Sequence, residues 1–143
     1  MNSDASELLH LTHRTDLGIF VGRWGYQPTA AALPAVYQEL KQQALAAGCP
    51  FWLQDIRRRS FNDPEVTQWL LTEFFPEMGH LLGGRLSVAY LVGPTLMEAI
   101  LAGPGFVGPA AYDGQPFVIA FFGDEGDAIS WLNQQQSATA ANG

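Results

Sequence analysis

Apolar residues in this chain follow two alternating patterns, and these predict its secondary structure. Five short runs are rich in apolar residues and bounded by glycine, proline or charged residues, which is typical of β-strands. These runs cover residues 8–13, 18–24, 50–56, 85–93 and 116–122. Only the turn-forming sequence RTDLG separates the first two runs, and so short a connection predicts an antiparallel hairpin.

The segments between the later runs are predicted to be helices. In residues 32–47 the apolar positions recur every three or four residues, which places them on one helical face. That face consists of Leu33, Val36, Tyr37, Leu40 and Ala44. A second helix should begin after the N-cap Asp63 with Pro64 in its first turn, and Pro76 should end or kink it near Phe75. The remaining predicted helices cover residues 94–102 and 123–136.

The order of these elements predicts an α/β fold. Strands and helices alternate as β-β-α-β-α-β-α-β-α, so we expect a mixed, mostly parallel sheet of about five strands and about four helices. The chain is long enough for one domain, residues 1–143, with an ordered core over 8–133 and flexible tails at 1–6 and 137–143. Residues 103–115 are rich in glycine and proline and are expected to form an irregular loop.

Composition and charge narrow the classes of function. Residues 1–59 carry six basic and five acidic residues, whereas Arg85 is the single base against nine acids in the remainder, for a net charge of −7. This balance argues against general nucleic-acid binding, which needs a basic surface. The N-terminus lacks the pattern of a signal peptide, and no apolar run approaches the roughly 20 residues of a membrane helix. With Cys49 as the only cysteine, we expect a cytoplasmic protein without an internal disulfide.

Three segments carry a resemblance to a known family. They read FWLQDIRRRS at 51–60, RLSVAYLV at 85–92 and FFGDEGDAISWL at 121–132. Together with the order of elements over residues 8–133, they resemble the STAS-like family, in particular its stand-alone bacterial branch. That family includes bacterial anti-sigma-factor antagonists and the cytosolic domains of sulfate transporters. The resemblance implies a regulatory module that binds a protein partner or senses a ligand.

The resemblance does not extend to the family's phosphorylation switch. Antagonists of this family are phosphorylated on a serine at the start of the helix after the third strand, in a motif of the type D-S-[ST]-G. Here the region reads SFNDPEV, and Pro64 and Glu65 occupy the expected hydroxyl positions. Ser60 is the nearest hydroxyl, but it precedes the N-cap by three residues. We therefore expect a module without this switch.

The arginine triplet that follows the third strand is the first candidate site. The carboxyl ends of strands in open α/β sheets are common ligand sites, and arginines beside a helix N-terminus can hold an anion. The candidate residues are Asp55, Arg57, Arg58, Arg59, Ser60 and Asp63. We favour a simpler interpretation, in which the arginines pair with Asp55, Asp63 or Glu65 on a solvated edge. Docking of the acidic second half of another copy is a third interpretation.

The second candidate site is an apolar segment, residues 69–82. Adjacent Phe74 and Phe75 should not face the same way on a helix, so the segment should be apolar on more than one side. The binding candidates in it are Trp69, Phe74, Phe75 and Met78. Either the loop at 103–112 covers the extra side or another molecule does, and the second option predicts a homodimer.

No set of residues in the chain predicts catalysis or metal binding. Asp55 has no visible partner for acid–base chemistry, and Cys49 is interpreted as a small buried hydrophobe. His10 and His13 should lie on opposite faces of a strand, and His80 is isolated. No phosphate-binding or dinucleotide-binding motif is found, so we expect no cofactor.

Two functions remain open. The first is a non-catalytic, cytosolic module that binds an unknown protein partner or a small anionic or apolar ligand. The alternative is a small-molecule or lipid carrier in which residues 103–115 form a lid over an apolar pocket. The lining of such a pocket would include Phe74, Met78, Leu96 and Phe106.

Overall fold

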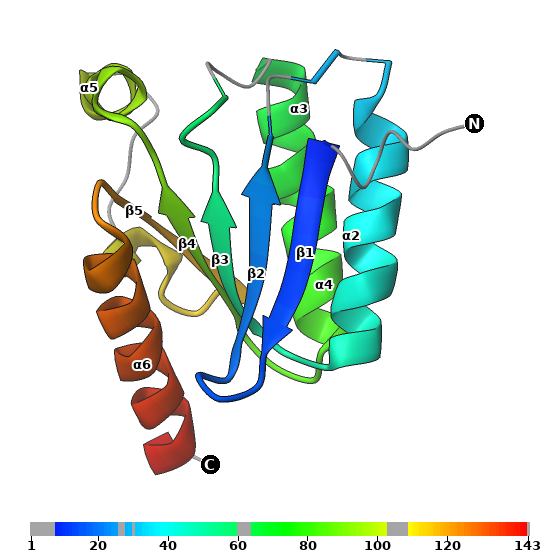
Figure 1. The fold of residues 1–143 in the computed structure, drawn as a ribbon. Coiled ribbons are helices and arrows are strands. Elements are labelled where there is room, and N and C mark those ends of the chain that lie inside the picture. The colour runs from blue at the N-terminus through cyan, green and yellow to red at the C-terminus, as the bar shows by residue number, and fades with distance from the viewer. Residues whose placement is uncertain (1–7, 26–27, 30, 60–63, 103–108, 143) are drawn as a thin grey trace.

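The chain folds into a five-stranded sheet with helices on both faces (Figure 1). A computed structural model describes residues 8–25, 28–29, 31–59, 64–102 and 109–142. The strands are β1 (Leu9–Arg14), β2 (Ile19–Trp24), β3 (Phe51–Asp55), β4 (Leu86–Leu91) and β5 (Phe117–Phe122). The helical segments are α2 (Leu33–Ala47), α3 (Pro64–Trp69), the π-helical η1 (Leu70–Phe74), α4 (Phe75–Leu81), α5 (Pro94–Ala102), the 3₁₀ segment η2 (Pro109–Tyr112) and α6 (Glu125–Asn142).

The sheet has the simplest possible strand order, β1-β2-β3-β4-β5. Strand β1 pairs with β2 in the antiparallel direction, and every later pair is parallel, so the predicted α/β class, hairpin and mostly parallel sheet are confirmed. Since parallel crossovers are right-handed, successive steps in one direction place α2 and α3–α4 on the same face. Helix α6 packs on the opposite face, against β3, β4 and β5 (Figure 1).

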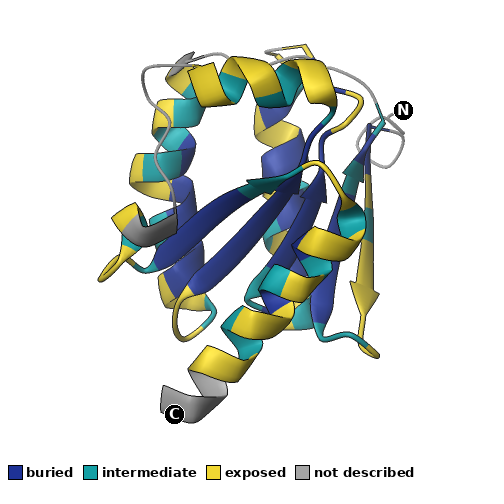
Figure 2. Ribbon diagram, turned by 90° about the vertical axis from the view of Figure 1, so that its left-hand side faces the viewer, coloured by how far each residue is buried: buried dark blue, intermediate teal, exposed yellow. Residues whose placement is uncertain are grey.

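Burial follows this layering (Figure 2). Every residue of β4 is buried, because helices cover both of its faces, whereas the edge strand β1 is mostly exposed. On the face of α2 and α3–α4, which we call the helix-rich face, the core includes Phe20, Trp52 and Val88. On the α6 face a smaller cluster surrounds Ala128 and Leu132, which are fully buried.

The second predicted helix differs from its expected form. It does not end near Phe75, which was one of the two outcomes expected from Pro76. Instead the chain passes through η1, where the N–H of Phe75 donates to the carbonyl of Leu70, five residues earlier. Pro76 then lies in the first turn of α4, a position that tolerates its missing N–H. Asp63, the expected N-cap, lies outside the described residues.

The C-terminal ends of α2 and α6 can be compared with their sequences. Gly48 ends α2 in the left-handed conformation, with φ of 63°, and its N–H donates to the carbonyl of Ala44. Helix α6 continues to Asn142, so residues 137–142, where a flexible tail was expected, are helical. Its sequence SATAAN contains three alanines, the strongest helix former, which accounts for the extension.

Candidate functional site at the carboxyl edge of the sheet

The three consecutive arginines do not form one patch. The N–H of Arg59 donates to the carbonyl of Ile56 at 3.0 Å, which closes a tight turn with Arg57 and Arg58 at its centre. This turn directs Arg57 toward Asp55, leaves Arg58 exposed and places Arg59 in the interior, where it is only 6% exposed. The triplet therefore divides between two different environments.

Arg57 belongs to an ion-pair cluster on the α6 face, which consists of Arg23, Asp55, Arg57 and Glu125. Nε and Nη2 of Arg57 donate to the two carboxylate oxygens of Asp55 at 2.9 and 2.8 Å. Nη1 of Arg23 donates to Asp55 at 2.9 Å and to Glu125 at 3.0 Å, and its Nη2 reaches the second oxygen of Glu125 at 3.2 Å. The cluster thus connects β2, β3 and the first turn of α6.

The charges of this cluster hold one another in their ionised forms. Burial by itself would raise the pKa of Asp55, but hydrogen bonds from Arg57 and Arg23 outweigh it and leave the pKa below its ordinary value. Hydrogen bonds to the carboxylates raise the pKa of Arg23 and of Arg57. Pairing of an arginine with Asp55, the simpler interpretation of the triplet, is therefore found for Arg57.

Arg59 belongs to a second group on the helix-rich face, which we call the buried arginine cluster: Trp24, Tyr37, Gln54 and Arg59. The guanidinium carbon of Arg59 lies 4.5 Å from the centre of the Trp24 ring, in a cation–π arrangement. Arg59 also donates a hydrogen bond to the Tyr37 hydroxyl. The indole N–H of Trp24 donates to Oε1 of Gln54 at 3.0 Å. One indole thus carries the cation on its face and the amide at its edge.

Gln54 is the least expected member of the cluster. It is 3% exposed in the central strand, yet its Nε2 atom has no hydrogen-bond partner. The amide lies against Gly22 of the neighbouring strand, where a Cβ atom would approach Nε2 to 2.8 Å. A buried donor without a partner costs about 1–3 kcal/mol, so its presence calls for an explanation.

Aromatic rings surround the buried arginine cluster. The Tyr37 ring lies 5.6 Å from that of Trp24, 5.5 Å from Trp69 and 5.4 Å from Phe74, with centre-to-centre distances typical of packed aromatic pairs. Beyond Gln54 in the same row of the sheet, Tyr90 stacks on Phe121. Burial raises the pKa of both Tyr37 and Tyr90, so both phenols are neutral.

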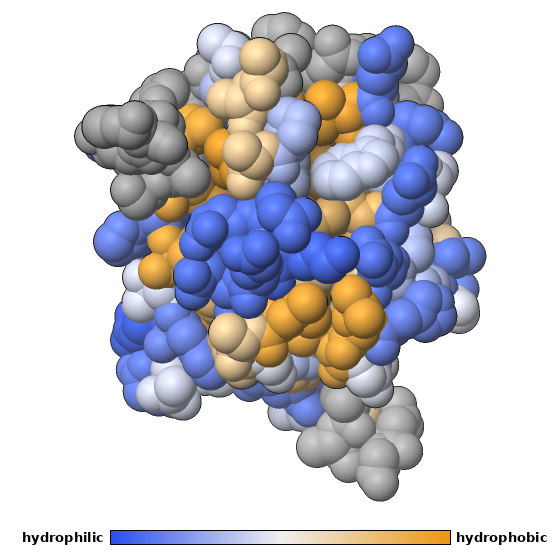
Figure 3. All heavy atoms as spheres, turned by 90° about the vertical axis from the view of Figure 1, so that its right-hand side faces the viewer, coloured by the Kyte–Doolittle hydropathy of each residue, from blue (hydrophilic) through white to orange (hydrophobic). Residues whose placement is uncertain are grey.

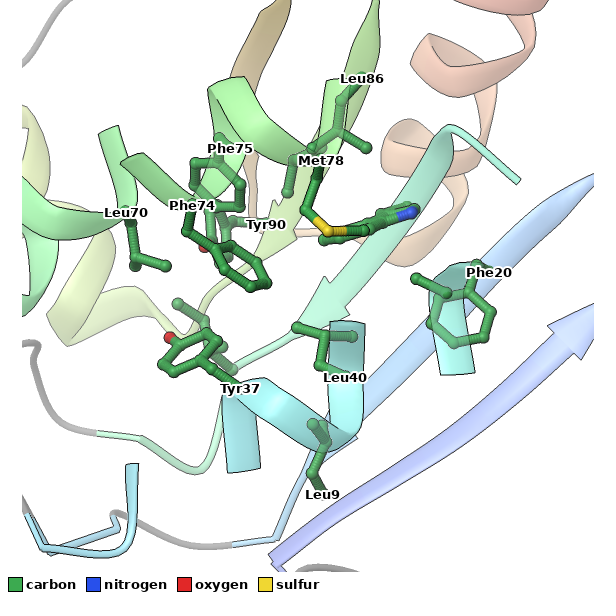
Figure 4. Packing of buried hydrophobic residues seen from close by; sticks show 14 of the residues in the cluster. Leu9, Phe20, Tyr37, Leu40, Leu70, Phe74, Phe75, Met78, Leu86 and Tyr90 are labelled. Atoms are coloured by element: carbon green, nitrogen blue, oxygen red, sulfur yellow. The ribbon is translucent and has the colours of Figure 1, made fainter. Parts of the chain in front are cut away.

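The residues of the apolar candidate segment lie mainly in the core. Phe74, Phe75 and Met78 are 3%, 2% and 0% exposed and lie in the core (Figure 4). Trp69 is half-buried. Phe74 and Phe75 have different neighbours, but both are buried, so neither ring provides the exposed apolar side that was expected of this segment. Phe74 packs on Trp52, and Phe75 packs on Phe117.

A smaller apolar surface remains outside on α2 and α4. Lys41 of α2 pairs with Glu77 of α4 at 3.2 Å, and one turn further along each helix come Leu45 and Leu81. These leucines are 37% and 52% exposed. Figure 3 shows apolar groups beside a polar band on this side of the molecule. Any dimer built on this segment would use these leucines rather than Phe74 or Phe75.

Other candidate residues are not brought into either cluster. The Cys49 thiol is buried, which raises its pKa, and it lies 3.2 Å from the carbonyl oxygen of Gly18. The register of β1 places His10 opposite Arg23 and His13 opposite Phe20. Within the described ranges, no group of three or more His, Cys, Asp or Glu side chains could hold a metal ion. Ser60 and Phe106 lie outside these ranges.

Five residues of these two clusters were not predicted from the sequence as site residues: Arg23, Trp24, Tyr37, Gln54 and Glu125. Arg23 stands directly opposite Asp55, and Gly22 opposite Gln54, in the parallel register of β2 and β3. The polar residue Gln54 inside the run FWLQD was the one visible signal, because a buried strand seldom contains an amide.

Comparisons with known proteins assign neither a family nor a function to the chain. No family model matches the chain, and searches of curated proteins and of solved structures find no match. Nor does any helix in the described part of the chain combine the length and apolarity needed to cross a bilayer. The functional interpretation therefore depends on the site itself.

Proposed function

We propose that the chain is a non-catalytic, cytosolic, STAS-like module that binds a small ligand or a protein partner at the carboxyl edge of its sheet. The buried arginine cluster is the observation that carries this proposal. A cation, an unpartnered amide donor and aromatic rings lie together at the ends of β2 and β3. The carboxyl edge is where open α/β sheets most often bind ligands.

A binding role is favoured over catalysis by the state of Asp55. This residue was the candidate general base, but guanidinium groups of Arg23 and Arg57 already occupy its carboxylate oxygens. Its pKa lies below the ordinary value, which makes it a weak base at neutral pH. Cys49 is a poor nucleophile, because burial raises the pKa of its thiol.

The STAS-like assignment is supported by the arrangement of elements. An antiparallel hairpin, β1–β2, leads into a sheet whose later pairs are parallel, and a final helix packs on the opposite face. The sequence SFNDPEV, at the position of the family's phosphorylated serine, lies mostly outside the described residues. The expectation that this switch is missing remains a prediction.

The carrier hypothesis has less support. Phe74 and Met78, two of the four residues expected to line its pocket, are packed against the chain's own side chains. Helix α5 provides the observation in its favour. It has no fully buried residue, Leu96 is half-buried, and Leu101 is 56% exposed. An apolar ligand or partner at α5 would account for this exposure.

Native mass spectrometry of protein purified from its own host tests the proposal. We expect a ligand or partner to co-purify with the wild type and with the matched variant Arg58→Gln, and to be lost from Arg59→Gln. Tyr37→Phe keeps the ring but removes the hydroxyl that meets Arg59, and it should weaken retention without unfolding the chain. Failure of anything to co-purify, or equal retention by Arg58→Gln and Arg59→Gln, would contradict the proposal. Circular dichroism confirms that each variant is folded.

A further inference from the structure

The outer edge of strand β1 supports a further inference. We propose that this edge pairs with the β1 edge of a second copy of the chain, in the antiparallel direction, so that the two sheets join into one. The inference goes beyond the proposed function, because it concerns a different surface and does not depend on binding at the carboxyl edge. Three properties of β1 support it: its outward backbone groups, its lack of cover, and the residues that self-pairing brings together.

Alternate residues of β1 direct their backbone groups away from the sheet. The N–H of Gly25 donates to the carbonyl of Leu8 at 2.7 Å, which makes these two residues a hydrogen-bonded pair. Such pairs alternate with non-hydrogen-bonded pairs along an antiparallel ladder, so the even-numbered residues of β1 bond to β2. The N–H and C=O groups of Leu9, Leu11 and His13 therefore point outward. Within the described ranges, β2 is the only strand beside β1, and these outward groups have no hydrogen-bond partner.

The two edges of the sheet differ in how they are covered. At the β5 edge, residues 117–120 are at most 6% exposed, and η2 packs on that strand. Strand β1, by contrast, is exposed at four of its six positions (Figure 2). It has no proline and no bulge, and Arg14 at its end is its only lysine or arginine, so it lacks most of the features with which edge strands avoid pairing. The β1 edge is thus open to another strand.

The outward residues define the register in which two copies can pair. Around a two-fold axis, the register centred on Leu11 is the one that uses all three outward residues. It places Leu11 opposite Leu11 of the second copy, and Leu9 opposite His13. On the other face of the sheet it places His10 opposite Thr12. The half-buried Leu11 would then gain an apolar neighbour, and no like charges would face each other.

The distribution of charge also favours a second copy at this edge. Each copy has a net charge of −7, but residues 1–59 sum to +1, and the acidic excess lies in residues 60–143. Strand β1 is at the opposite end of the sheet from β4, β5 and α6, which belong to the acidic part (Figure 1). Two copies joined at β1 would therefore hold these acidic elements apart. Arg14 would lie beyond the paired residues, and it already pairs with Asp16 at 2.7 Å.

Sedimentation equilibrium tests the dimer. Strand pairing by itself buries less than the roughly 1,000 Å² of a stable interface, so we expect a weak dimer whose population rises with concentration. His13→Pro removes an outward N–H that the β1–β2 ladder does not use, and proline is tolerated at such positions of an edge strand. It should raise the dissociation constant of the dimer at least about tenfold, whereas the matched variant His13→Ala should change it less than about threefold. Circular dichroism confirms that both variants are folded.

A disulfide experiment tests the register. In a Cys49→Ala background, Leu11→Cys should form a linked dimer on mild oxidation, because the Cα atoms of the two copies of position 11 would lie about 5.5 Å apart, within disulfide range. Asp16→Cys is the matched control. This position is more exposed, but its two copies would lie roughly 30 Å apart along the strands, so it should give at least about tenfold less linked dimer. If His13→Pro does not fold, this comparison still decides the question.

Three results would overturn the inference. The first is a chain that stays monomeric up to about 1 mM, a concentration at which even a weak dimer would be populated. The second is a dimer that folded His13→Pro does not weaken, which would place the contact on another surface, such as that of Leu45 and Leu81. The third is equal linking by Leu11→Cys and Asp16→Cys.

Discussion

The ion-pair cluster and the buried arginine cluster lie on opposite faces of one sheet edge, and the turn at residues 56–59 supplies an arginine to each. In the first cluster, the side chains of Arg23 and Arg57 are 40% and 50% exposed, and each pairs with a carboxylate. In the second, Arg59 is 6% exposed and lies on an indole beside an unpartnered amide donor. Residues that look alike in the sequence therefore have different physical roles.

The difference follows from the solvent around each cluster. Water and salt screen the half-exposed pair of Arg23 with Glu125, which contributes little stability by itself, whereas the pairs that Asp55 makes are screened only from the side of its arginines. Inside the helix-rich face, each polar group must find a partner within the protein or a ligand, because water is excluded. For this reason we propose that binding takes place on the buried side.

The largest expected effect compares one tryptophan from each side. Trp24→Ala removes the support of Arg59, the donor to Gln54 and the contact with Tyr37, and should lower the free energy of unfolding by about 3–5 kcal/mol. Trp131→Ala, on α6, removes a half-buried ring that packs on Phe122 and should cost about 1–2 kcal/mol. Urea unfolding measures both, and equal losses would remove the distinction between the two faces.

A smaller effect is expected from Gln54→Leu. This change removes the unpartnered donor, but it also leaves the buried indole N–H of Trp24 without an acceptor, so we expect a loss of about 1–3 kcal/mol. In the double variant Gln54→Leu/Trp24→Phe both polar partners are absent. Its loss of unfolding free energy should therefore be smaller than the sum of the losses of the two single variants. Strict additivity in a double-mutant cycle would show that the hydrogen bond has no net effect.

The contribution of the ion-pair cluster to the stability of the chain should depend on pH. The pKa of Asp55 is depressed in the folded chain, so its contribution is present above pH 3.8, the ordinary value, and is lost as pH falls through the folded pKa. We expect Asp55→Asn to cost about 1–2 kcal/mol at pH 7, with exposure of the partner arginines limiting the effect. The difference from wild type should shrink below pH 3.8, and a difference that stays constant down to pH 2.5 would argue against the assignment.

The elements could be predicted from the sequence, because each depends on local patterns. Gly48 follows the periodic residues of α2, and the apolar runs of β3 and β4 mark strands that are buried on both faces. The π turn could not be predicted in this way. It requires the core to accept Phe74 and Phe75 together, and only packing against Trp52 and Phe117 makes that favourable.

The two clusters were harder to predict, because they depend on register and on one turn. Strand alternation would place Asp55, Arg57 and Arg59 on the same face, but β3 ends at Asp55 and the turn at residues 56–59 reverses the direction of Arg59. The pairing of Arg23 with Asp55 joins residues 32 positions apart and requires knowledge that β2 lies beside β3. Neither property has a local signal in the sequence.

The most direct test of this account is the unfolding free energy of Arg57→Gln, Arg58→Gln and Arg59→Gln, measured by urea denaturation under identical conditions. We predict a loss of about 2 kcal/mol or more for Arg59, because its stem and guanidinium are buried on Trp24. The loss should stay below about 1 kcal/mol for the half-exposed Arg57, and within about 0.5 kcal/mol for the exposed Arg58. Equal losses for the three variants, or the largest loss at Arg58, would contradict the division of the triplet between two environments.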